Sequence, residues 1–332
     1  MSSVLPLNPT DLGIILTYHC QCACAHCLYN CGPGWSDWMS FESVESAMQA
    51  TMAWKQPVRV RLTGGEPFLN YPLLLHAVQV ASRMQISCYA ETNAGWCVQG
   101  DLVADRFLQL RDNGLQAILI SCSPFHAAVI PLKRTLLAIA VALEVFGSDR
   151  VMVYMVEWLD QLRRFGFDDA IPLDQYIESY GAGPTGVMFW QGYSLVPGGR
   201  SGFHLGHLTH RQQVSAFQGE NCRPEIVYPH RAQLDLYGNI IPSYCGGLTP
   251  GRWENIPQLR EDFKMDGFSP LIAILVDSGP FGLFTFARDQ HGYRPLRSGY
   301  VGKCHLCVDV RRHLAKVGGF VELKPHQFYE SI

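Results

Sequence analysis

The chain has 332 residues, of which 48% are hydrophobic and 17% are charged, and it carries 26 basic against 29 acidic side chains. This composition excludes a disordered or fibrous protein and is enough for one large or two modest hydrophobic cores. A formal charge of -3 leaves no net positive field for a phosphate backbone, although the run Arg311-Arg312-His313 could form a local basic patch. We therefore expect no nucleic-acid partner.

Short apolar runs alternate with amphipathic stretches through the first 200 residues, as they do in repeated βα units around a parallel sheet. We predict helices at 40–55, 72–83, 102–113 and 132–146, the first capped by Ser40 and the second opened by Pro72. The predicted strands are 13–17, 58–63, 86–91, 117–121, 151–156 and 186–190. Six βα repeats indicate an α/β fold, a partial (β/α)6 parallel barrel.

The alternation stops after the turn-rich segment 197–202, which places a domain boundary at residue 200. Residues 1–200 would form the barrel, and residues 201–332 a small α+β domain. Within the second domain, 232–243 predicts a β-hairpin, because Gly238 and Asn239 tolerate the backbone of a tight turn. Residues 252–300 look irregular apart from a short helical stretch near 270–276.

The 12 cysteines are concentrated at two places, with five between residues 20 and 31 and four beyond residue 220. The N-terminus lacks the basic segment and following apolar core that form a secretion signal. No apolar run reaches the roughly 18 residues of a membrane span. Disulfides are rare without secretion. We therefore expect a cytoplasmic protein with no membrane partner, whose cysteines bind metal.

The first group of cysteines follows the first predicted strand in a Cys-x3-Cys-x2-Cys pattern formed by Cys20, Cys24 and Cys27. Three thiolates on one loop can hold three irons of a cubane cluster and leave the fourth iron open for a chelating ligand. A structural zinc site is the alternative, and it would need a fourth ligand from Cys22, Cys31 or a histidine.

This loop resembles the signature of the radical S-adenosylmethionine superfamily. The turn Gly64-Gly65-Glu66-Pro67 follows the second predicted strand and is similar to the turn that contacts the amino group of S-adenosylmethionine in that superfamily. The resemblance implies that the glycines let the backbone approach the ligand and that Glu66 offers its carboxylate to the ammonium group. It also implies a 4Fe-4S cluster, bound S-adenosylmethionine and an external one-electron reductant such as flavodoxin or ferredoxin.

Polar and reactive side chains close the third and fourth predicted strands. The resemblance implies contacts of Asn93 and Ser121 with the ribose and carboxylate of S-adenosylmethionine, although such residues also cap helices. Cys122 could donate a hydrogen atom to a substrate radical and His126 could accept a proton, while a packed thiol and a solvent-facing histidine are the alternatives. The other cysteines expected only to pack are Cys22, Cys31, Cys88 and Cys97.

The second group of cysteines resembles the shortened auxiliary-cluster domain called Twitch, a relative of the SPASM domain. Its order is Cys222, the hairpin glycine Gly238, Cys245, and then the pair Cys304 and Cys307. The resemblance implies a second 4Fe-4S cluster, fully ligated by four thiolates and therefore suited to electron relay. The same four cysteines could instead form a structural zinc site.

The resemblance implies that S-adenosylmethionine is cleaved reductively to a 5'-deoxyadenosyl radical, which abstracts hydrogen from a substrate. Only 19 residues precede Cys20, whereas many peptide-modifying relatives begin with a leader-recognition domain. We therefore expect oxidation or epimerisation of a small molecule such as a sugar, aminocyclitol or nucleoside derivative. The alternatives are a peptide or protein maturase and, from a different class, a non-catalytic iron-sulfur or zinc protein.

Overall fold

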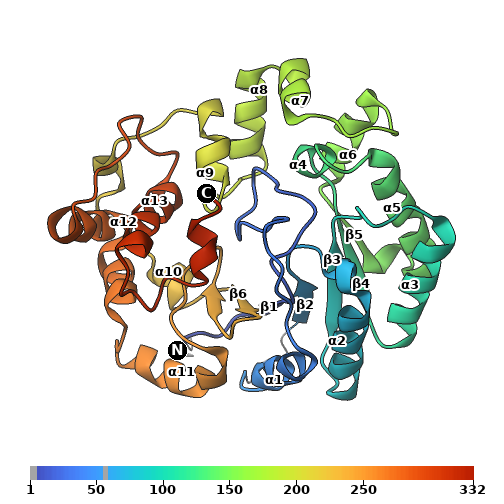
Figure 1. Cartoon of the computed structure of the whole chain (residues 1–332), viewed down its shortest axis with the longest axis horizontal. Coiled ribbons are helices and arrows are strands. Elements are labelled where there is room, and N and C mark those ends of the chain that lie inside the picture. The colour runs from blue at the N-terminus through green and yellow to red at the C-terminus, as the bar shows by residue number, and fades with distance from the viewer. Residues whose placement is uncertain (1–5, 55–58) are drawn as a thin grey trace. The chain divides into compact units, whose positions relative to one another are not determined.

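The computed structural model describes residues 6–54 and 59–332, which form two compact units (Figure 1). The sheet unit comprises Asp11–Cys24 and the described part of Cys31–Gly181. The C-terminal unit comprises Ala182–Ile332 together with residues 6–10 and Ala25–Asn30. The division thus falls after Gly181, nearer the N-terminus than residue 200, and two short N-terminal segments group with the C-terminal unit.

Five parallel strands form the sheet unit in the order β5-β4-β3-β2-β1. Their bounds are β1 Asp11–Ile15, β2 Arg59–Thr63, β3 Cys88–Thr92, β4 Ala117–Ser121 and β5 Val151–Tyr154. Strands β1 and β2 are almost continuously buried, as parallel strands covered on both faces are. The prediction of a strand at 117–121 is confirmed without a shift, and Val58, predicted to open β2, lies outside the described residues.

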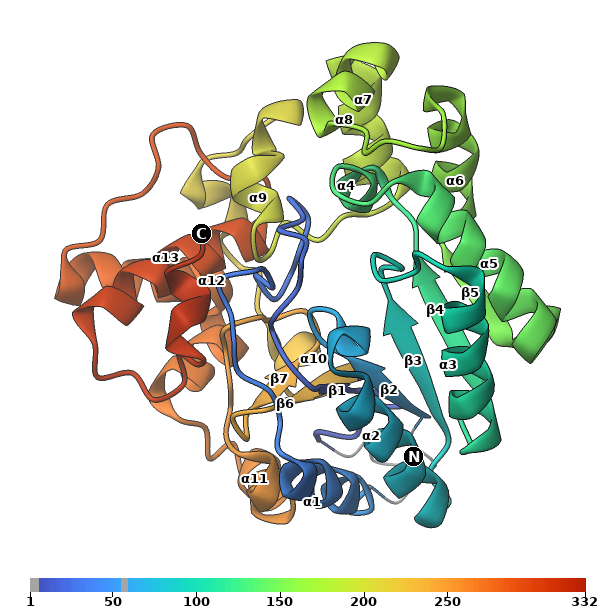
Figure 2. The same cartoon turned by 45° about the vertical axis from the view of Figure 1, so that its right-hand side comes forward.

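Helices connect these strands, and their starts follow the expected capping rules. Ser40 caps the first helix as predicted, because its hydroxyl accepts a hydrogen bond from the Ser43 amide at 3.1 Å. The helix predicted at 132–146 is confirmed, and it packs against α3 and β4 (Figure 2). The α-helices are α1 Phe41–Thr51, α2 Tyr71–Arg83, α3 Gly100–Asp112, α4 Pro124–Ala127, α5 Leu132–Phe146, α6 Val156–Leu162 and α7 Leu173–Tyr180. Short 3-10 turns lie at Pro67–Asn70, Ser148–Arg150 and Arg163–Phe165. Lys55, at the predicted end of the first helix, lies outside the described residues.

The prediction of a sixth strand at 186–190 is wrong, because this segment is helical and belongs to the C-terminal unit. Ala182–Val187 form α8, and Met188–Gly192 continue it as a turn of π-helix. Gly186 packs so closely that a Cβ there would lie 1.9 Å from the Leu208 carbonyl oxygen. A short apolar run fits a buried strand and a buried helix equally well, so the pattern alone could not decide. The described part of the sheet unit therefore contains five parallel strands.

The C-terminal unit is mainly helical, which corrects the irregular structure predicted for 252–300. Its α-helices after α8 are α9 Ser201–His204, α10 Arg223–Ile226, α11 Ile256–Lys264, α12 Pro270–His291 and α13 Lys303–Val317. Its 3-10 turns are Gly206–Leu208, Val214–Phe217, Trp253–Asn255 and His326–Tyr329. Gly279 and Pro280 suggest a helix end in the sequence, but they form a kink inside α12, where Gly279 has a φ of +59°. A Cβ at Gly279 would lie 2.1 Å from the Glu220 carbonyl oxygen, so close packing explains the glycine.

Helix α12 contributes much of the hydrophobic core of the C-terminal unit. Its Leu275, Leu283 and Phe284 are buried in the same cluster as Val310 and Leu314 of α13. Among the described residues it is the one helix long and apolar enough to cross a membrane, and half of that apolar stretch is buried within the protein. Core helices have the same length and composition, so this is weak evidence for a span. The stretch is interrupted by polar residues, glycine and proline, and so contains no long unbroken apolar run.

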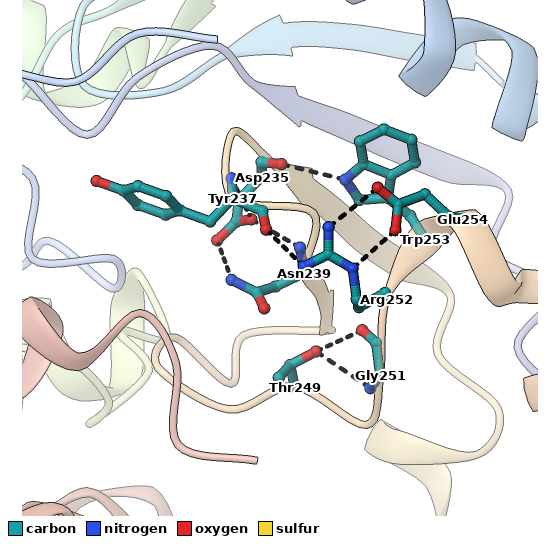
Figure 3. A network of polar contacts seen from close by, with 8 residues as sticks. All are labelled: Asp235, Tyr237, Asn239, Thr249, Gly251, Arg252, Trp253 and Glu254. Carbon is teal, nitrogen blue, oxygen red and sulfur yellow. Dashed lines mark hydrogen bonds and ion pairs between the residues drawn. The ribbon is translucent and has the colours of Figure 1, made fainter. Parts of the chain in front are cut away.

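The predicted hairpin is confirmed as β6 Arg231–Asp235 paired antiparallel with β7 Ile240–Pro242. Asp235 closes the turn, because its carboxylate accepts hydrogen bonds from the amides of Tyr237 at 3.0 Å and Asn239 at 2.8 Å (Figure 3). Gly238 has a φ of +88°, and a Cβ there would lie 2.4 Å from an Arg252 guanidinium nitrogen. The positive φ therefore favours glycine at this position, and the Arg252 guanidinium occupies the space beside it.

Candidate functional site

The Cys20 to Cys27 loop leaves the sheet directly after β1. Backbone hydrogen bonds hold its base, from the Cys20 amide to the Gly32 carbonyl at 3.2 Å and from the Gly32 amide to the Tyr18 carbonyl at 3.1 Å. Cys20 and Cys24 are buried and Cys27 is partly exposed. Cys27 lies in the segment that groups with the C-terminal unit. The two hydrogen bonds between Gly32 and the segment at Tyr18 and Cys20 fix where the loop begins.

The Gly64-Gly65-Glu66 turn follows β2 and packs directly on the segment between β1 and the cysteine loop. The Gly65 amide donates to the Thr17 carbonyl at 2.7 Å, and the Glu66 amide donates to the His19 carbonyl at 2.9 Å. A Cβ at Gly64 would lie 2.4 Å from the Thr17 carbonyl oxygen, and one at Gly65 would lie 1.9 Å from that of His19. Both glycines are thus required because the backbone of this turn packs directly against the backbone of Thr17 and His19. The sequence pattern did not reveal this reason.

The Glu66 carboxylate is fully buried and accepts hydrogen bonds from three groups of the protein. One oxygen accepts from the Phe68 amide at 3.1 Å and the Thr92 hydroxyl at 3.0 Å, and the other accepts from the Asn93 amide at 2.7 Å. Burial raises the pKa of Glu66 to about 7, although these three donors lower it. The side chain therefore ties the turn after β2 to the end of β3.

Asn93 lies between Glu66 and the cysteine loop, and its side chain is turned toward sulfur. Its amide nitrogen donates to the sulfur of Cys20 at 3.4 Å and, more weakly, to that of Cys22 at 3.9 Å. Its carbonyl oxygen accepts from the Gln21 side chain at 2.8 Å. Asn93, predicted only as a ligand contact, is thus a neighbour of the first cysteine. Gln21 was missed by the sequence reasoning, and a polar side chain inside the cysteine loop was the only available signal.

The predicted residues after β4 are arranged differently from one another. Ser121 ends β4 and is partly exposed, whereas Cys122 is buried and hydrogen-bonds through its amide to the Tyr154 carbonyl at 2.6 Å. Burial raises the pKa of the Cys122 thiol to about 12, so this thiol is protonated at neutral pH. His126 hydrogen-bonds through Nδ1 to the hydroxyl of Ser123 at 2.7 Å, and its charge lowers the pKa of Glu66. Glu66 and His126 both follow the carboxyl ends of parallel strands, β2 and β4.

The four C-terminal cysteines come from three separate segments of one unit. Cys222 precedes α10, Cys245 follows the hairpin, and Cys304 and Cys307 lie in the first turns of α13. Burial and the charges of Cys307 and Cys245 raise the pKa of Cys222, and burial with the charge of Cys307 raises that of Cys304 to about 12. Each thiol lies in the electrostatic field of the others, so the fold brings the four together.

The thiol spacing that binds a single metal ion differs from the spacing that binds a cubane cluster. Within residues 6–54 and 59–332, no three His, Cys, Asp or Glu side chains meet at the spacing of one metal ion. A cubane cluster spaces its thiolates more widely than a single ion does, because each sulfur binds a different iron.

The basic run at 311–313 does not form the surface patch that the sequence allowed. Arg311 is buried, with only 2% of its surface exposed. Arg312 pairs with Asp309 at 3.1 Å, and His313 hydrogen-bonds to the His291 carbonyl at 2.7 Å. Arg311 follows Cys307 by four residues on α13, and this helical spacing was the signal that could have placed it near the cysteines.

Comparisons with known proteins give distant structural likenesses. No protein-family profile and no curated protein sequence matches the chain. BtrN in complex with AdoMet and 2-DOIA is 12% identical, with a TM-score of 0.45 over 82% of this chain and 89% of BtrN. The protein anSMEcpe with bound AdoMet and Cp18Cys peptide is 14% identical, with a TM-score of 0.43 over 97% and 95%. Streptococcus suis SuiB bound to S-adenosylmethionine is 13% identical, with a TM-score of 0.36 over 70% and 60%.

Replacing Gly65 by Ala should destabilise the sheet unit by about 1–3 kcal/mol, because the new methyl group would collide with the His19 backbone. Gly34→Ala is the matched control, since among the described residues no atom beyond its chain neighbours lies within 4 Å of the added carbon there. Its unfolding free energy should stay within about 0.5 kcal/mol of the parent. Urea denaturation of both variants measures the effect, and equal stabilities would contradict the packing described for Gly65.

Glu66 should make folding stability depend on pH. Its pKa rises from 4.5 to about 7 on folding, so the unfolded chain releases this proton at lower pH than the folded protein does. The stability contributed by the carboxyl group is present below pH 4.5 and is lost as the pH rises to about 7. The difference in unfolding free energy between the parent and Glu66→Gln should therefore change across this window in favour of the variant. A difference that stays constant in urea denaturation at pH 5, 6 and 7 would contradict the raised pKa.

Proposed function

We propose that this chain is a cytoplasmic radical S-adenosylmethionine enzyme that abstracts a hydrogen atom from its substrate. One observation carries the proposal: the turn at 64–66 and Asn93, from the ends of β2 and β3, converge on the start of the Cys20 loop after β1. The carboxyl ends of parallel strands are where α/β proteins place their ligands. Three cysteines of this loop, Cys20, Cys24 and Cys27, are the proposed iron ligands.

The residues present fit an iron-sulfur cluster by the chemistry of their donors. Cys20 is buried, and its hydrogen bond with Cys22 and its burial raise its pKa, so the thiol becomes a thiolate only when a metal replaces its proton. When bound, the cluster supplies the electron that cleaves S-adenosylmethionine to methionine and a 5'-deoxyadenosyl radical. The Asn93 amide donates toward the sulfur of Cys20, and hydrogen bonds to cluster sulfurs adjust the reduction potential.

Cofactor contacts are proposed for Gly64, Gly65, Glu66, Asn93 and Ser121. The structure adds that the Glu66 carboxylate is enclosed by three donors of the protein itself. We therefore propose that Glu66 also supports the binding of S-adenosylmethionine by holding Asn93 and the turn in position. Cys122 remains the proposed hydrogen-atom donor and His126 the proposed proton acceptor. The protonated state of the buried Cys122 thiol is the one that carries a hydrogen atom.

The second proposed cofactor is an auxiliary 4Fe-4S cluster in a Twitch-like C-terminal domain. Its support is that Cys222, Cys245, Cys304 and Cys307 lie in one unit, and that burial and the charges of the neighbouring cysteines raise the pKa of Cys222, Cys245 and Cys304. Four thiolates complete the ligation of such a cluster, which then relays electrons and does not bind substrate. Structural zinc on the same four cysteines is the alternative.

The proposed reaction is oxidation or epimerisation of a small sugar, aminocyclitol or nucleoside-type molecule, with flavodoxin or ferredoxin as the external reductant. Modification of a peptide or protein is the alternative within the enzyme class. A non-catalytic iron-sulfur or zinc protein is the alternative outside it. Each of the three predicts a different result in the two experiments below.

Anaerobic reconstitution should load about eight irons per chain, because seven cysteines divide into an open set of three and a closed set of four. Replacing Cys20, Cys24 and Cys27 together by Ala should leave about four irons. Iron and zinc are measured by elemental analysis. Loss of all iron with zinc retained would assign the C-terminal cysteines to structural zinc.

Turnover with S-adenosylmethionine, dithionite and substrates deuterated at carbon should produce 5'-deoxyadenosine only when Cys20, Cys24 and Cys27 are intact. Deuterium should enter this product from the true substrate alone, since a primary radical takes hydrogen only from a bond held within near-attack distance. Mass spectrometry measures the label. Transfer from peptides and not from small molecules would overturn the substrate proposal, and absence of 5'-deoxyadenosine under every reducing condition would overturn the enzyme proposal.

A further inference from the structure

Arg311 is a buried cation beside three of the four cysteines of the C-terminal unit, Cys245, Cys304 and Cys307. Helix α13 carries Cys304, Cys307 and Arg311 at spacings of three and four residues, which places all three on one face of the helix. The guanidinium donates from Nη1 to the Gly246 carbonyl at 2.9 Å and to the Tyr329 hydroxyl at 2.8 Å. Because Gly246 directly follows Cys245, one side chain links the helix with two cysteines to the loop with a third.

The charge of Arg311 is not balanced by the neutral partners that hold it. A backbone carbonyl and a phenol accept its hydrogen bonds, and its buried Nε has no hydrogen-bond partner among the described residues. A guanidinium is not deprotonated in proteins, so Arg311 keeps its positive charge in this buried position. A buried charge without a counter-ion costs free energy, and protonated thiols supply no negative charge.

The other described cations adjacent to these cysteines in the chain are paired. Arg223 follows Cys222 and lies 3.0 Å from the Asp266 carboxylate and 3.3 Å from that of Asp277. Lys303 precedes Cys304, and its ammonium lies 2.8 Å from the Glu225 carboxylate and 3.9 Å from that of Glu220. The charge of Lys303 acts on Cys222 and Cys304, but the two carboxylates balance it. The uncompensated positive charge at this site is therefore that of Arg311.

We propose that Arg311 is a positioning residue and the buried counter-ion of the auxiliary cluster, and that it raises the reduction potential of this cluster. The inference rests on the proposed function, because it requires the four cysteines to hold a 4Fe-4S cluster as thiolates. One electron from a reductant adds one negative charge to a site that is already anionic. A fixed positive charge in a low-dielectric interior stabilises the reduced form more than the oxidised form.

The experiment uses the full chain with Cys20, Cys24 and Cys27 replaced by Ala, so that only the C-terminal cysteines can hold a cluster. After anaerobic reconstitution, the cluster is titrated with dithionite, a one-electron reductant, and the reduced form is followed by electron paramagnetic resonance. Arg311→Met should shift the reduction potential to more negative values, and Arg311→Lys, which keeps the charge, should shift it less. Iron content and circular dichroism are recorded for every variant.

Arg312→Met is the matched control, because it removes the same charge one residue along α13 from a side chain already paired with Asp309 at 3.1 Å. This variant should keep the parent potential. Equal shifts for Arg311→Met and Arg312→Met, or a parent potential in Arg311→Met, would overturn the proposal.

Iron retention covers the case in which Arg311→Met does not hold the cluster. Loss of iron from this variant alone, with Arg311→Lys and Arg312→Met retaining about four irons, supports the counter-ion role. Loss from Arg311→Lys as well overturns it, since that variant keeps the charge. Zinc without iron in the parent overturns both the auxiliary cluster and the role of Arg311. If the chain with all its cysteines still produces 5'-deoxyadenosine, the radical-enzyme proposal stands even when the auxiliary cluster and the role of Arg311 are overturned.

Discussion

The hydrogen bonds between the 64–66 turn and the segment before Cys20 are the constraint on which the candidate site depends. They form because β1 and β2 are adjacent parallel strands whose carboxyl ends meet at one edge of the sheet. Two glycines allow the backbones to approach more closely than any side chain would permit. The direction in which the cysteine loop leaves the sheet is therefore set by backbone contacts, and the side chains of Glu66 and Asn93 act on a loop whose base is already fixed.

Buried charge is handled differently at the two groups of cysteines. Glu66 is buried with three hydrogen-bond donors around its oxygens, an arrangement that partly offsets the cost of burial and ties two strand ends together. Arg311 is buried with neutral acceptors and the thiols of Cys245, Cys304 and Cys307 nearby, and we propose that these become anionic and balance its charge. The protein's own donors stabilise the Glu66 carboxylate, whereas the proposed partner of the Arg311 charge is an anionic group among the cysteines.

Elements with a strong local signal were predicted well. The strand at 117–121 and the helix at 132–146 have their periodic patterns and flanking turns in the sequence, and both are found where predicted. The segment 186–190 and the helix α12 were not, because short apolar runs and an internal Gly-Pro pair have more than one structural solution. Close contacts of Gly186 with Leu208 and of Gly279 with Glu220 decide between these solutions, and such contacts join residues far apart in the chain.

The sequence by itself determined which chemistry is possible, because the types and spacings of the cysteines, glycines and Glu66 are local properties of the chain. It also indicated the hairpin, since Gly238 and Asn239 allow the backbone of a tight turn. Only the tertiary structure decided that Asn93 faces the sulfur of Cys20, that Glu66 is enclosed by the protein's own donors, and that Arg311 is buried beside the cysteines of α13 and Cys245. The reason is physical: burial and electrostatic environment arise from segments that meet only on folding, so no local pattern records them.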